Sequence, residues 1–224
     1  MRELHFYFDF ISPYAYFAWC QVGNFCQQHG LTLVAKPVVF GKLLDHWGQL
    51  GPAEVPPKRE WLIRYCLRYA DRNNLPLVFP PQHPFKSLTA LRLCLPEVCG
   101  QLQIETINRL FHLGWAEGRD LADPQVLLDG LCTISPAPEK WLAMTQTPEI
   151  KEKLKTETEQ AITLGVFGVP TFFFNGELFW GNDQFPFLAD SVAGKSFDSI
   201  KYQEILGRPR AIDRKVRNPS GDQT

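Results

Sequence analysis

The residue best suited to holding an anion is Ser12, in the run Asp9-Phe10-Ile11-Ser12-Pro13-Tyr14. Serine is a preferred N-cap and proline is favoured at the first helical position, so a helix is expected to begin here. Backbone N–H groups without partners and the positive end of the helix dipole would then surround the Ser12 hydroxyl. That hydroxyl could donate a hydrogen bond to a thiolate supplied by a ligand. The alternative interpretation is that Ser12 only caps the helix.

A second candidate lies far along the chain, where Val169-Pro170-Thr171 follows the glycine-containing loop 165–168. Only about 5–6% of X-Pro bonds in folded proteins are cis. This pattern nevertheless resembles the cis-proline loop of the thioredoxin superfamily, which faces the helix corner. We therefore predict a cis bond between Val169 and Pro170, close to Ser12. The Val169 backbone would offer its N–H and C=O groups to an extended peptide. An ordinary trans turn is the alternative.

The third candidate is Trp180-Gly181-Asn182-Asp183, at the start of the last expected helix. Either Asn182 or Asp183 is expected to be the N-cap of that helix. An exposed carboxylate at this place could also pair with the α-ammonium of a γ-glutamyl group, while backbone N–H groups hold the carboxylate of that group.

These segments need strands that bring them together. The aromatic run 4–10 is typical of a buried strand, and 31–40 is predicted to be a second strand, parallel to the first. Asn175-Gly176 is a strong two-residue hairpin turn between the strand segments 170–174 and 177–180.

Helical patterns account for most of the remaining chain. Helices are predicted over 14–28 (ending at Gly30), 58–72, 86–95, 101–117, 124–132, 148–164 and 183–192. The apolar stripe of the helix over 58–72 is predicted to consist of Trp61, Leu62, Tyr65 and Tyr69.

This order of elements predicts an α/β protein with a thioredoxin-like fold and an all-helical insertion, similar to DsbA and the kappa-class glutathione transferases. Residues 1–40 and 165–205 would form the thioredoxin-like domain, 41–164 the helical insertion, and 206–224 a C-terminal tail expected to be mobile. A separate helical domain explains the pattern less well, because the flanking strands would be left as incomplete sheets.

Composition limits the classes of function. With 23 basic and 24 acidic side chains, the formal net charge of −1 gives no general attraction to nucleic acid or anionic membranes. Asp9 interrupts the apolar N-terminal run, and no apolar run reaches the roughly 20 residues that span a bilayer, so neither a secretory signal nor a membrane helix is expected. The six cysteines include no Cys-x-x-Cys pair, so we expect free, buried thiols in a reducing cytoplasm and no metal site.

Taken together, the motifs resemble the 2-hydroxychromene-2-carboxylate isomerase family and its relatives, the kappa-class glutathione transferases. The resemblance spans nearly the whole chain, and it is specific in the order and spacing of the three segments described above. Weaker support comes from Gly51-Pro52 and Val78-Phe79-Pro80. The resemblance implies that glutathione is the cofactor and Ser12 the catalytic residue. It assigns glutathione contacts to Ser12, Pro13, Tyr14, Glu54, Val169, Pro170, Gly181, Asn182 and Asp183.

The reaction that the resemblance implies interconverts 2-hydroxychromene-2-carboxylate and trans-o-hydroxybenzylidenepyruvate, or a related aromatic intermediate. A glutathione thiolate would add to the electrophilic carbon, allow the former double bond to rotate, and then leave. Ser12 and the helix terminus would lower the pKa of the thiol. A substrate pocket is expected beside the helical insertion. Its candidate residues are Lys42, His83 and Lys86 for the carboxylate, with Phe85 or Trp47 against the ring.

Two positions depart from the family pattern. Glu54 stands where many of these isomerases have asparagine, and Gln184 stands where the family has arginine. Both departures affect glutathione affinity or substrate choice more than the type of reaction.

Other functions remain open at this point. A kappa-like glutathione transferase or peroxidase would share all three motifs, and a non-catalytic glutathione- or peptide-binding protein could use the same fold. A DsbA-like disulfide oxidoreductase is excluded, because residues 12–15 contain no cysteine. The partner is expected to be a small aromatic carboxylate rather than nucleic acid or a membrane, and a homodimer is possible.

Overall fold

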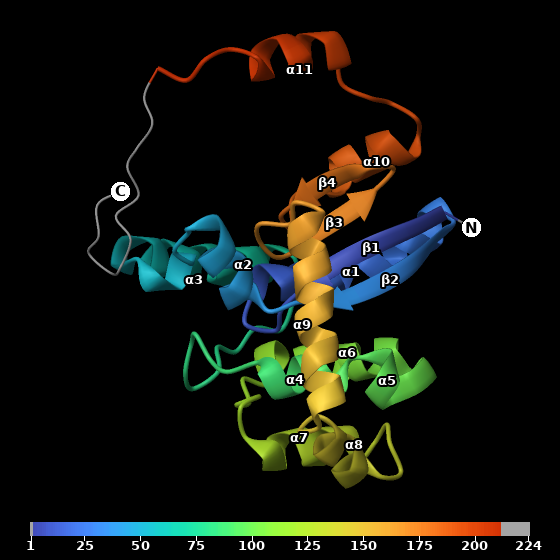
Figure 1. Cartoon of the computed structure of the whole chain (residues 1–224). Coiled ribbons are helices and arrows are strands. Elements are labelled where there is room, and N and C mark those ends of the chain that lie inside the picture. Colours follow the sequence, from blue (N-terminus) through green and yellow to red (C-terminus); the bar gives the residue numbers. More distant parts are fainter. Residues whose placement is uncertain (1, 212–224) are drawn as a thin grey trace, which may run out of the picture.

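The computed structural model describes residues 2–211. Within this range it contains one four-stranded mixed sheet with strand order β2-β1-β3-β4 (Figure 1). The strands are β1 (Arg2–Phe8), β2 (Leu31–Pro37), β3 (Thr171–Phe174) and β4 (Glu177–Trp180).

Helices surround this sheet. They are α1 (Pro13–His29), α2 (Phe40–Trp47), α3 (Pro56–Arg72), α4 (Leu88–Leu93), α5 (Pro96–Cys99), α6 (Gln103–Phe111), α7 (Pro124–Leu131), α8 (Pro138–Met144), α9 (Pro148–Thr163), α10 (Phe185–Val192) and α11 (Ser199–Leu206). Two short 3₁₀ turns cover Pro52–Glu54 and Gly100–Leu102, and a π-helical segment, His112–Ala116, continues α6. No helix within residues 2–211 is long and apolar enough to cross a membrane.

The strand pairing confirms the predicted topology. β1 and β2 are parallel and are joined through α1, whereas β3 runs antiparallel to both β1 and β4. The β3–β4 turn places Asn175 at φ 49° and Gly176 at φ 81°. Both angles lie in the left-handed region, which a two-residue hairpin of the Asn-Gly kind requires. The predicted thioredoxin-like fold is confirmed, while the division into two domains stays a prediction.

Both N-terminal strands end earlier in the sequence than predicted, because a buried carboxylate turns the chain at their ends. β1 stops at Phe8 and β2 at Pro37. Just beyond them, the Asp9 carboxylate accepts hydrogen bonds from the Ile11 N–H (3.1 Å) and the Phe40 N–H (3.0 Å). The predicted strand end at residue 40 is therefore wrong, since α2 begins there.

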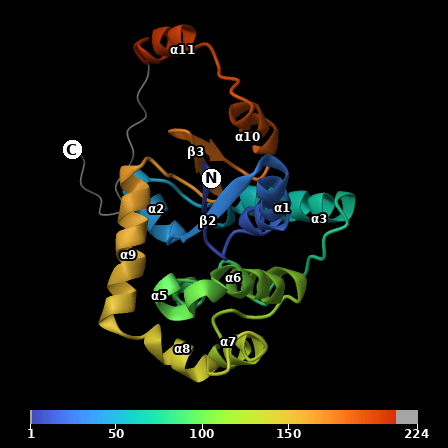
Figure 2. The same cartoon turned by 90° about the vertical axis from the view of Figure 1, so that its right-hand side faces the viewer.

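The two faces of the sheet have separate cores. Alternate β1 side chains, Leu4, Phe6 and Phe8, enter a large cluster shared with α1, α3 and α6, whereas Tyr7 points to the other face. There it belongs to a small cluster with residues of α2, α9 and the loop before β3. Figures 1 and 2 show α9 and α2 on one side of the sheet, α1 and α3 on the other, and α4–α8 packed beyond one edge.

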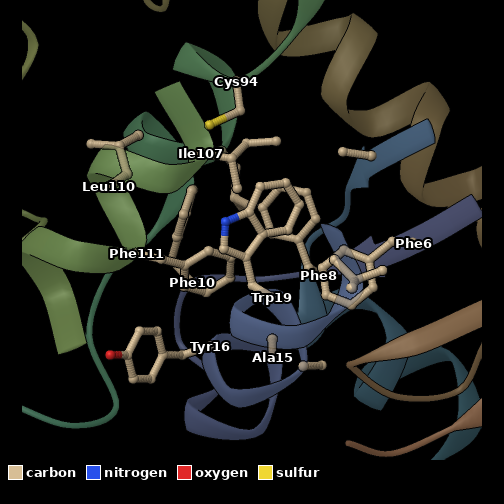
Figure 3. Close-up of a cluster of buried hydrophobic side chains, with 14 of the residues drawn as sticks. Phe6, Phe8, Phe10, Ala15, Tyr16, Trp19, Cys94, Ile107, Leu110 and Phe111 are labelled. Atoms are coloured by element: carbon tan, nitrogen blue, oxygen red, sulfur yellow. The ribbon is translucent and has the colours of Figure 1, made fainter. Parts of the chain in front are cut away.

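Aromatic rings join the strand layer to the helical block. Phe8 lies 5.6 Å from Phe111 and 6.1 Å from Trp19, measured between ring centroids, and Trp19 stacks on Phe111 (Figure 3). Trp115 is fully buried and donates its indole N–H to the Phe10 carbonyl at 2.8 Å. These contacts fix the segment between β1 and α1 against the helices.

Several further sequence predictions need correction. Helices α2, α5, α8 and α11 lie in segments for which no helix was predicted. Trp61, assigned to an apolar stripe, is 59% exposed. All six thiols are free, as predicted, but not all are buried: Cys20, in α1, and Cys132, at the end of α7, are exposed. The predicted mobile tail falls mostly on residues 212–224, which lie outside the described range.

Candidate active site

Ser12 stands at the corner between β1 and α1, and its hydroxyl makes two hydrogen bonds. Its Oγ accepts from the Ala15 N–H at 3.2 Å, which confirms it as the N-cap of α1. The same hydroxyl donates to the Val169 carbonyl at 3.3 Å. An O–H···O bond is ordinarily about 2.7–2.8 Å long, so this second bond is weak. The hydroxyl proton is therefore available to a stronger acceptor.

The helix terminus adds a favourable field for an anion. Helix α1 has 17 residues, no acidic side chain in its first turn, and proline at its first position. The Tyr14 N–H, at the second position, has no acceptor within residues 2–211. The partial positive charge of the terminus and this free donor both favour a negative charge beside Ser12.

The loop before β3 faces Ser12, as predicted. The Val169–Pro170 peptide bond is cis, and the Pro170 carbonyl accepts from the Gly181 N–H at 3.0 Å. The Val169 N–H has no acceptor in the described part of the chain. Gly168 has no room for a side chain, because a Cβ there would lie 2.6 Å from the Trp180 indole nitrogen. Backbone contacts thus join the second and third motifs directly.

A tyrosine of α3 links the corner to the third motif. The ring of Tyr65 lies 5.4 Å from that of Tyr14, and its hydroxyl is 3.5 Å from Asn182 Nδ2, which donates to it. Trp61 also stacks on Tyr65, at 5.2 Å between ring centroids. The sequence analysis assigned Tyr65 only to the apolar stripe of its helix. The spacing of Trp61, Tyr65 and Tyr69, one turn apart each, was the available signal of an aromatic face.

The predicted capping role of Asn182 or Asp183 is wrong. The N-cap of α10 is Gln184, without a side-chain cap bond. Gly181 has a φ of +120°, which turns the chain so that the Asp183 carboxylate folds back towards Gly181. Asn182 is buried and points to Tyr65, while Asp183 is exposed and accepts a bond from Gln184 Nε2 at 3.4 Å. Asp183 is therefore free to meet a cation from solvent.

Beneath the corner lies the buried carboxyl of Asp9. Only 2% of the residue is exposed, and burial raises the pKa of its carboxyl. Hydrogen bonds from Ser87, Phe40 and Ile11 oppose that rise by stabilising the ionised form. The Asp9 backbone carbonyl also accepts from the Ser12 N–H at 3.1 Å. Asp9 thus holds the corner in place without facing solvent.

His83, a substrate candidate, contacts the backbone of this corner. Its Nε2 is 3.0 Å from the Ile11 carbonyl oxygen. Because a carbonyl only accepts, Nε2 carries the proton, and Nδ1 of the neutral ring is left as an acceptor. Burial and then the charge of Arg59 lower the pKa of His83, whereas the bond to Ile11 raises it. No sequence motif indicated a role for Arg59, which lies at the start of α3.

Of the other candidates, Trp47 and Phe85 make structural contacts, whereas the charged residues are exposed. Trp47 donates its indole N–H to the Val166 carbonyl at 3.0 Å, which ties α2 to the loop before β3. Phe85 is buried beside Trp115 and belongs to the main core, so packing explains it. Lys42 is exposed and paired with Asp45.

Glu54 and Lys86 are also exposed. The Glu54 carboxylate accepts from the Gly51 N–H at 2.9 Å. No contact within residues 2–211 joins Glu54, Lys42 or Lys86 to Ser12 or Val169. Their predicted roles at the site stay untested.

Comparison with known proteins agrees with this geometry. A family model described as a DSBA-like thioredoxin domain matches residues 3–193. The chain belongs to the DSBA-like thioredoxin domain family. This member of the family carries serine at the corner, so its chemistry differs from that of a protein with a cysteine pair there.

Named relatives cover most of this DSBA-like chain. A 2-hydroxychromene-2-carboxylate isomerase of Pseudomonas putida is 29% identical over 198 residues, which cover 85% of this chain and 93% of the relative. A kappa 2 glutathione S-transferase of Caenorhabditis elegans is 24% identical over 86% of this chain and 92% of its own length. A solved 2-hydroxychromene-2-carboxylate isomerase superposes with a TM-score of 0.74 at 25% identity, over 92% of this chain and 100% of that structure.

Proposed function

We propose that the protein is a glutathione-dependent isomerase that interconverts 2-hydroxychromene-2-carboxylate and trans-o-hydroxybenzylidenepyruvate, or a closely related aromatic intermediate. The observation that carries the proposal is the 3.3 Å contact between the Ser12 hydroxyl and the Val169 carbonyl, at a corner without cysteine. It brings a hydroxyl donor, a helix terminus and a peptide-binding backbone to one point. The isomerase names of relatives along most of the chain support the choice of substrate.

The residues present fit glutathione. The Val169 N–H has no acceptor in the described chain and suits the cysteinyl backbone of the tripeptide. Asp183 is exposed and can pair with the α-ammonium of the γ-glutamyl group, with Asn182 held beside it by Tyr65. Ser12 and the Tyr14 N–H would then be the donors to the sulfur. When bound there, glutathione would supply a thiolate whose reversible addition makes the conjugated double bond single.

The protein's part in the reaction is to stabilise the thiolate. With glutathione bound, the Ser12 hydroxyl would donate to the sulfur in place of the Val169 carbonyl, and its Oγ could still accept from the Ala15 N–H. Because this hydrogen bond and the terminus of α1 favour the charged sulfur, they lower the pKa of the thiol. The buried Asp9 keeps the turn rigid, so no reorganisation of the donor is needed during reaction.

Two groups beside the corner suit an oxygen-rich aromatic substrate. Arg59 lies close enough to lower the pKa of His83 by its charge, so a substrate carboxylate there would meet a cation. The neutral His83 ring offers Nδ1 as an acceptor for a phenolic hydroxyl. Arg59 thus joins Lys42 and Lys86 as an expected partner of the substrate carboxylate. The ring of Trp47 borders the loop before β3, because its indole N–H donates to the Val166 carbonyl.

The proposal is tested by following interconversion of the two named compounds in the presence and absence of glutathione. We expect turnover that requires glutathione and that S-methylglutathione, which has no thiol, does not restore. Turnover without any thiol would overturn the covalent role of glutathione. No turnover of these compounds together with conjugation of chlorodinitrobenzene would favour the second candidate, a kappa-like transferase or peroxidase, which the kappa-class relatives support.

Retention on immobilised glutathione without turnover of any electrophile would instead indicate a non-catalytic binding protein. A cytoplasmic location and a homodimer accompany the proposed function as expectations. Fractionation of cells and size-exclusion chromatography with light scattering, respectively, test them.

A further inference from the structure

Helix α11 presents a group of apolar side chains to solvent. Tyr202, Ile205 and Leu206 lie on one side of this helix, because residues three and four positions apart share a face. Their exposed fractions are 46%, 50% and 63%, and no residue of α11 is buried. Figures 1 and 2 show α11 standing apart from the sheet and from the other helices, at the end of an extended segment.

Phe197 extends this apolar surface. Its ring lies 5.2 Å from that of Tyr202, between centroids, in an edge-to-face arrangement, and the residue is 55% exposed. We call the four residues Phe197, Tyr202, Ile205 and Leu206 the α11 face. Single exposed apolar residues are common on soluble proteins, whereas a contiguous group indicates a surface that meets an apolar partner.

The basic charge of the chain is concentrated around this helix. Residues 1–198 contain 17 basic and 21 acidic side chains, whereas residues 199–224 contain six basic and three acidic ones. Five of those six basic side chains lie within 208–217, directly after α11. The net charge of −1, from which no attraction to anionic membranes was expected, therefore averages an acidic body and a basic C-terminal segment.

A partner for both features must offer dense negative charge next to apolar material. A second copy of the chain fits poorly, because carboxylates of its body such as Glu97, Glu117 and Glu157 are already paired with basic side chains. Nucleic acid has the charge but offers the α11 face no apolar layer to enter. An anionic phospholipid surface offers both, because its phosphates lie directly above the apolar acyl chains.

We propose that α11 and the basic segment after it attach the protein to the surface of an anionic phospholipid membrane. The α11 face enters the boundary between headgroups and acyl chains, and the basic charge of 201–217 is attracted to the phosphates. Helix α11 has eight residues and is therefore about 12 Å long, so it lies on the membrane and does not span it. Such attachment takes two signals, here the apolar face and the basic segment. It does not involve Ser12 and does not rest on the proposed function.

The first test compares two kinds of vesicle. The full-length chain is sedimented with vesicles of phosphatidylcholine that contain anionic phosphatidylglycerol, and with vesicles of phosphatidylcholine alone. We expect at least tenfold tighter binding to the anionic vesicles. Raising the salt from about 0.1 M to about 1 M, which shortens the screening length from about 10 Å to about 3 Å, should release the protein. Equal binding to the two kinds of vesicle, or binding to neither, would overturn the proposal.

The second test asks whether the α11 face enters the bilayer. Ile205→Ser removes one side chain of the face. Ile200→Ser is the matched control, because Ile200 is 82% exposed but lies on the other side of the same helix. We expect Ile205→Ser to bind the anionic vesicles at least fivefold more weakly and Ile200→Ser to bind within twofold of wild type. Since no residue of α11 is buried, both should keep the wild-type thermal midpoint. Equal affinities of the two variants contradict the proposal.

The third test removes basic charge. One triple variant changes residues beyond α11: Arg214→Gln, Lys215→Gln and Arg217→Gln. Its control loses the same charge from exposed lysines of α8 and α9: Lys140→Gln, Lys151→Gln and Lys155→Gln. We expect at least tenfold weaker vesicle binding for the first variant and binding within twofold of wild type for the control. The same loss in both would mean that only the total charge matters, which contradicts a dedicated segment.

Two other partners would give different results. A dimer that light scattering detects in wild type and that Ile205→Ser abolishes would assign the α11 face to a second copy of the chain. Tighter binding to a short DNA duplex than to the anionic vesicles would assign the basic segment to nucleic acid. Either result would overturn attachment to a membrane.

Discussion

The Ser12 hydroxyl lies 3.3 Å from the carbonyl oxygen of Val169, although 157 positions separate the two residues. One partner is the N-cap of α1, and the other precedes a cis-proline that Gly181 binds through its N–H. The sheet produces this contact, because β1 and β3 are antiparallel neighbours with Tyr7 opposite Thr171. The end of one strand therefore meets the start of the other. The predictions below test what this meeting point does.

Replacing Ser12 with alanine should separate capping from catalysis. We expect Ser12→Ala to lose on the order of 10²-fold in turnover, as when one preorganised donor to an anion is removed, and about 1 kcal/mol of stability. The pKa of the bound glutathione thiol should rise, which thiolate absorbance against pH would measure. Thr147→Ala is the matched control, since Thr147 caps α9 through the Ile150 N–H far along the chain. If both variants lose stability but neither loses turnover, Ser12 is only a cap.

Replacing Asp183 should weaken glutathione binding without unfolding the protein. Its exposed carboxylate is expected to pair with the γ-glutamyl ammonium, so Asp183→Ala should raise the dissociation constant at least tenfold. The readout is the thermal shift, because glutathione at one hundred times its dissociation constant adds about 2.7 kcal/mol. Asp190→Ala, at an exposed aspartate of α10 paired with Lys195, is the control. Identical glutathione titrations for the two variants would remove Asp183 from the site.

Replacing Asp9 should destabilise the corner. Asp9→Asn keeps the shape, but its NH₂ group must face either the Ile11 or the Phe40 N–H. A buried donor without an acceptor costs about 1–3 kcal/mol, which urea unfolding at pH 7 measures. Asp123→Asn is the control, since Asp123 is an exposed N-cap of α7 and asparagine caps equally well. Equal stabilities of the two variants would show that the Asp9 carboxylate is not needed as an acceptor of both bonds.

His83 should make stability depend on pH between 5 and 7. Because burial and Arg59 lower the pKa of His83 in the folded state, the unfolded chain binds a proton first as pH falls. The stability that His83 contributes is full above its unfolded pKa of about 6.5 and is lost as pH falls towards its folded pKa, by at most ~1.4 kcal/mol per pH unit. His83→Gln retains a donor for the Ile11 carbonyl but does not titrate.

The free energy of unfolding of His83→Gln should therefore fall less than that of wild type from pH 7 to pH 5. Urea titrations at four pH values measure the difference. His46→Gln, at an exposed histidine of α2, is the control and should follow the wild type. A parallel decline of wild type and His83→Gln would contradict the lowered pKa.

The sequence by itself determined the local features of this protein. Ser12-Pro13 predicts the start of α1, Gly30 its end, and Asn175-Gly176 the hairpin, because each is a preference of a few adjacent residues for one backbone conformation. The cis bond at Val169-Pro170 was predicted instead from the likeness of its loop to the cis-proline loop of the thioredoxin superfamily, because local preference alone favours trans. The strand–helix–strand order then predicts which of these segments share an edge.

Only the tertiary structure decided which side chains meet at the site. Tyr65 and Asn182 are 117 positions apart, and their contact depends on how α3 packs against the turn after β4. His83 reaches the Ile11 carbonyl and Phe85 enters the core because a long loop is packed between Trp115 and the corner. Such contacts depend on how all the helices pack together, and no short segment of sequence determines that packing. Backbone preferences are local, whereas the surroundings of a side chain are set by the whole fold.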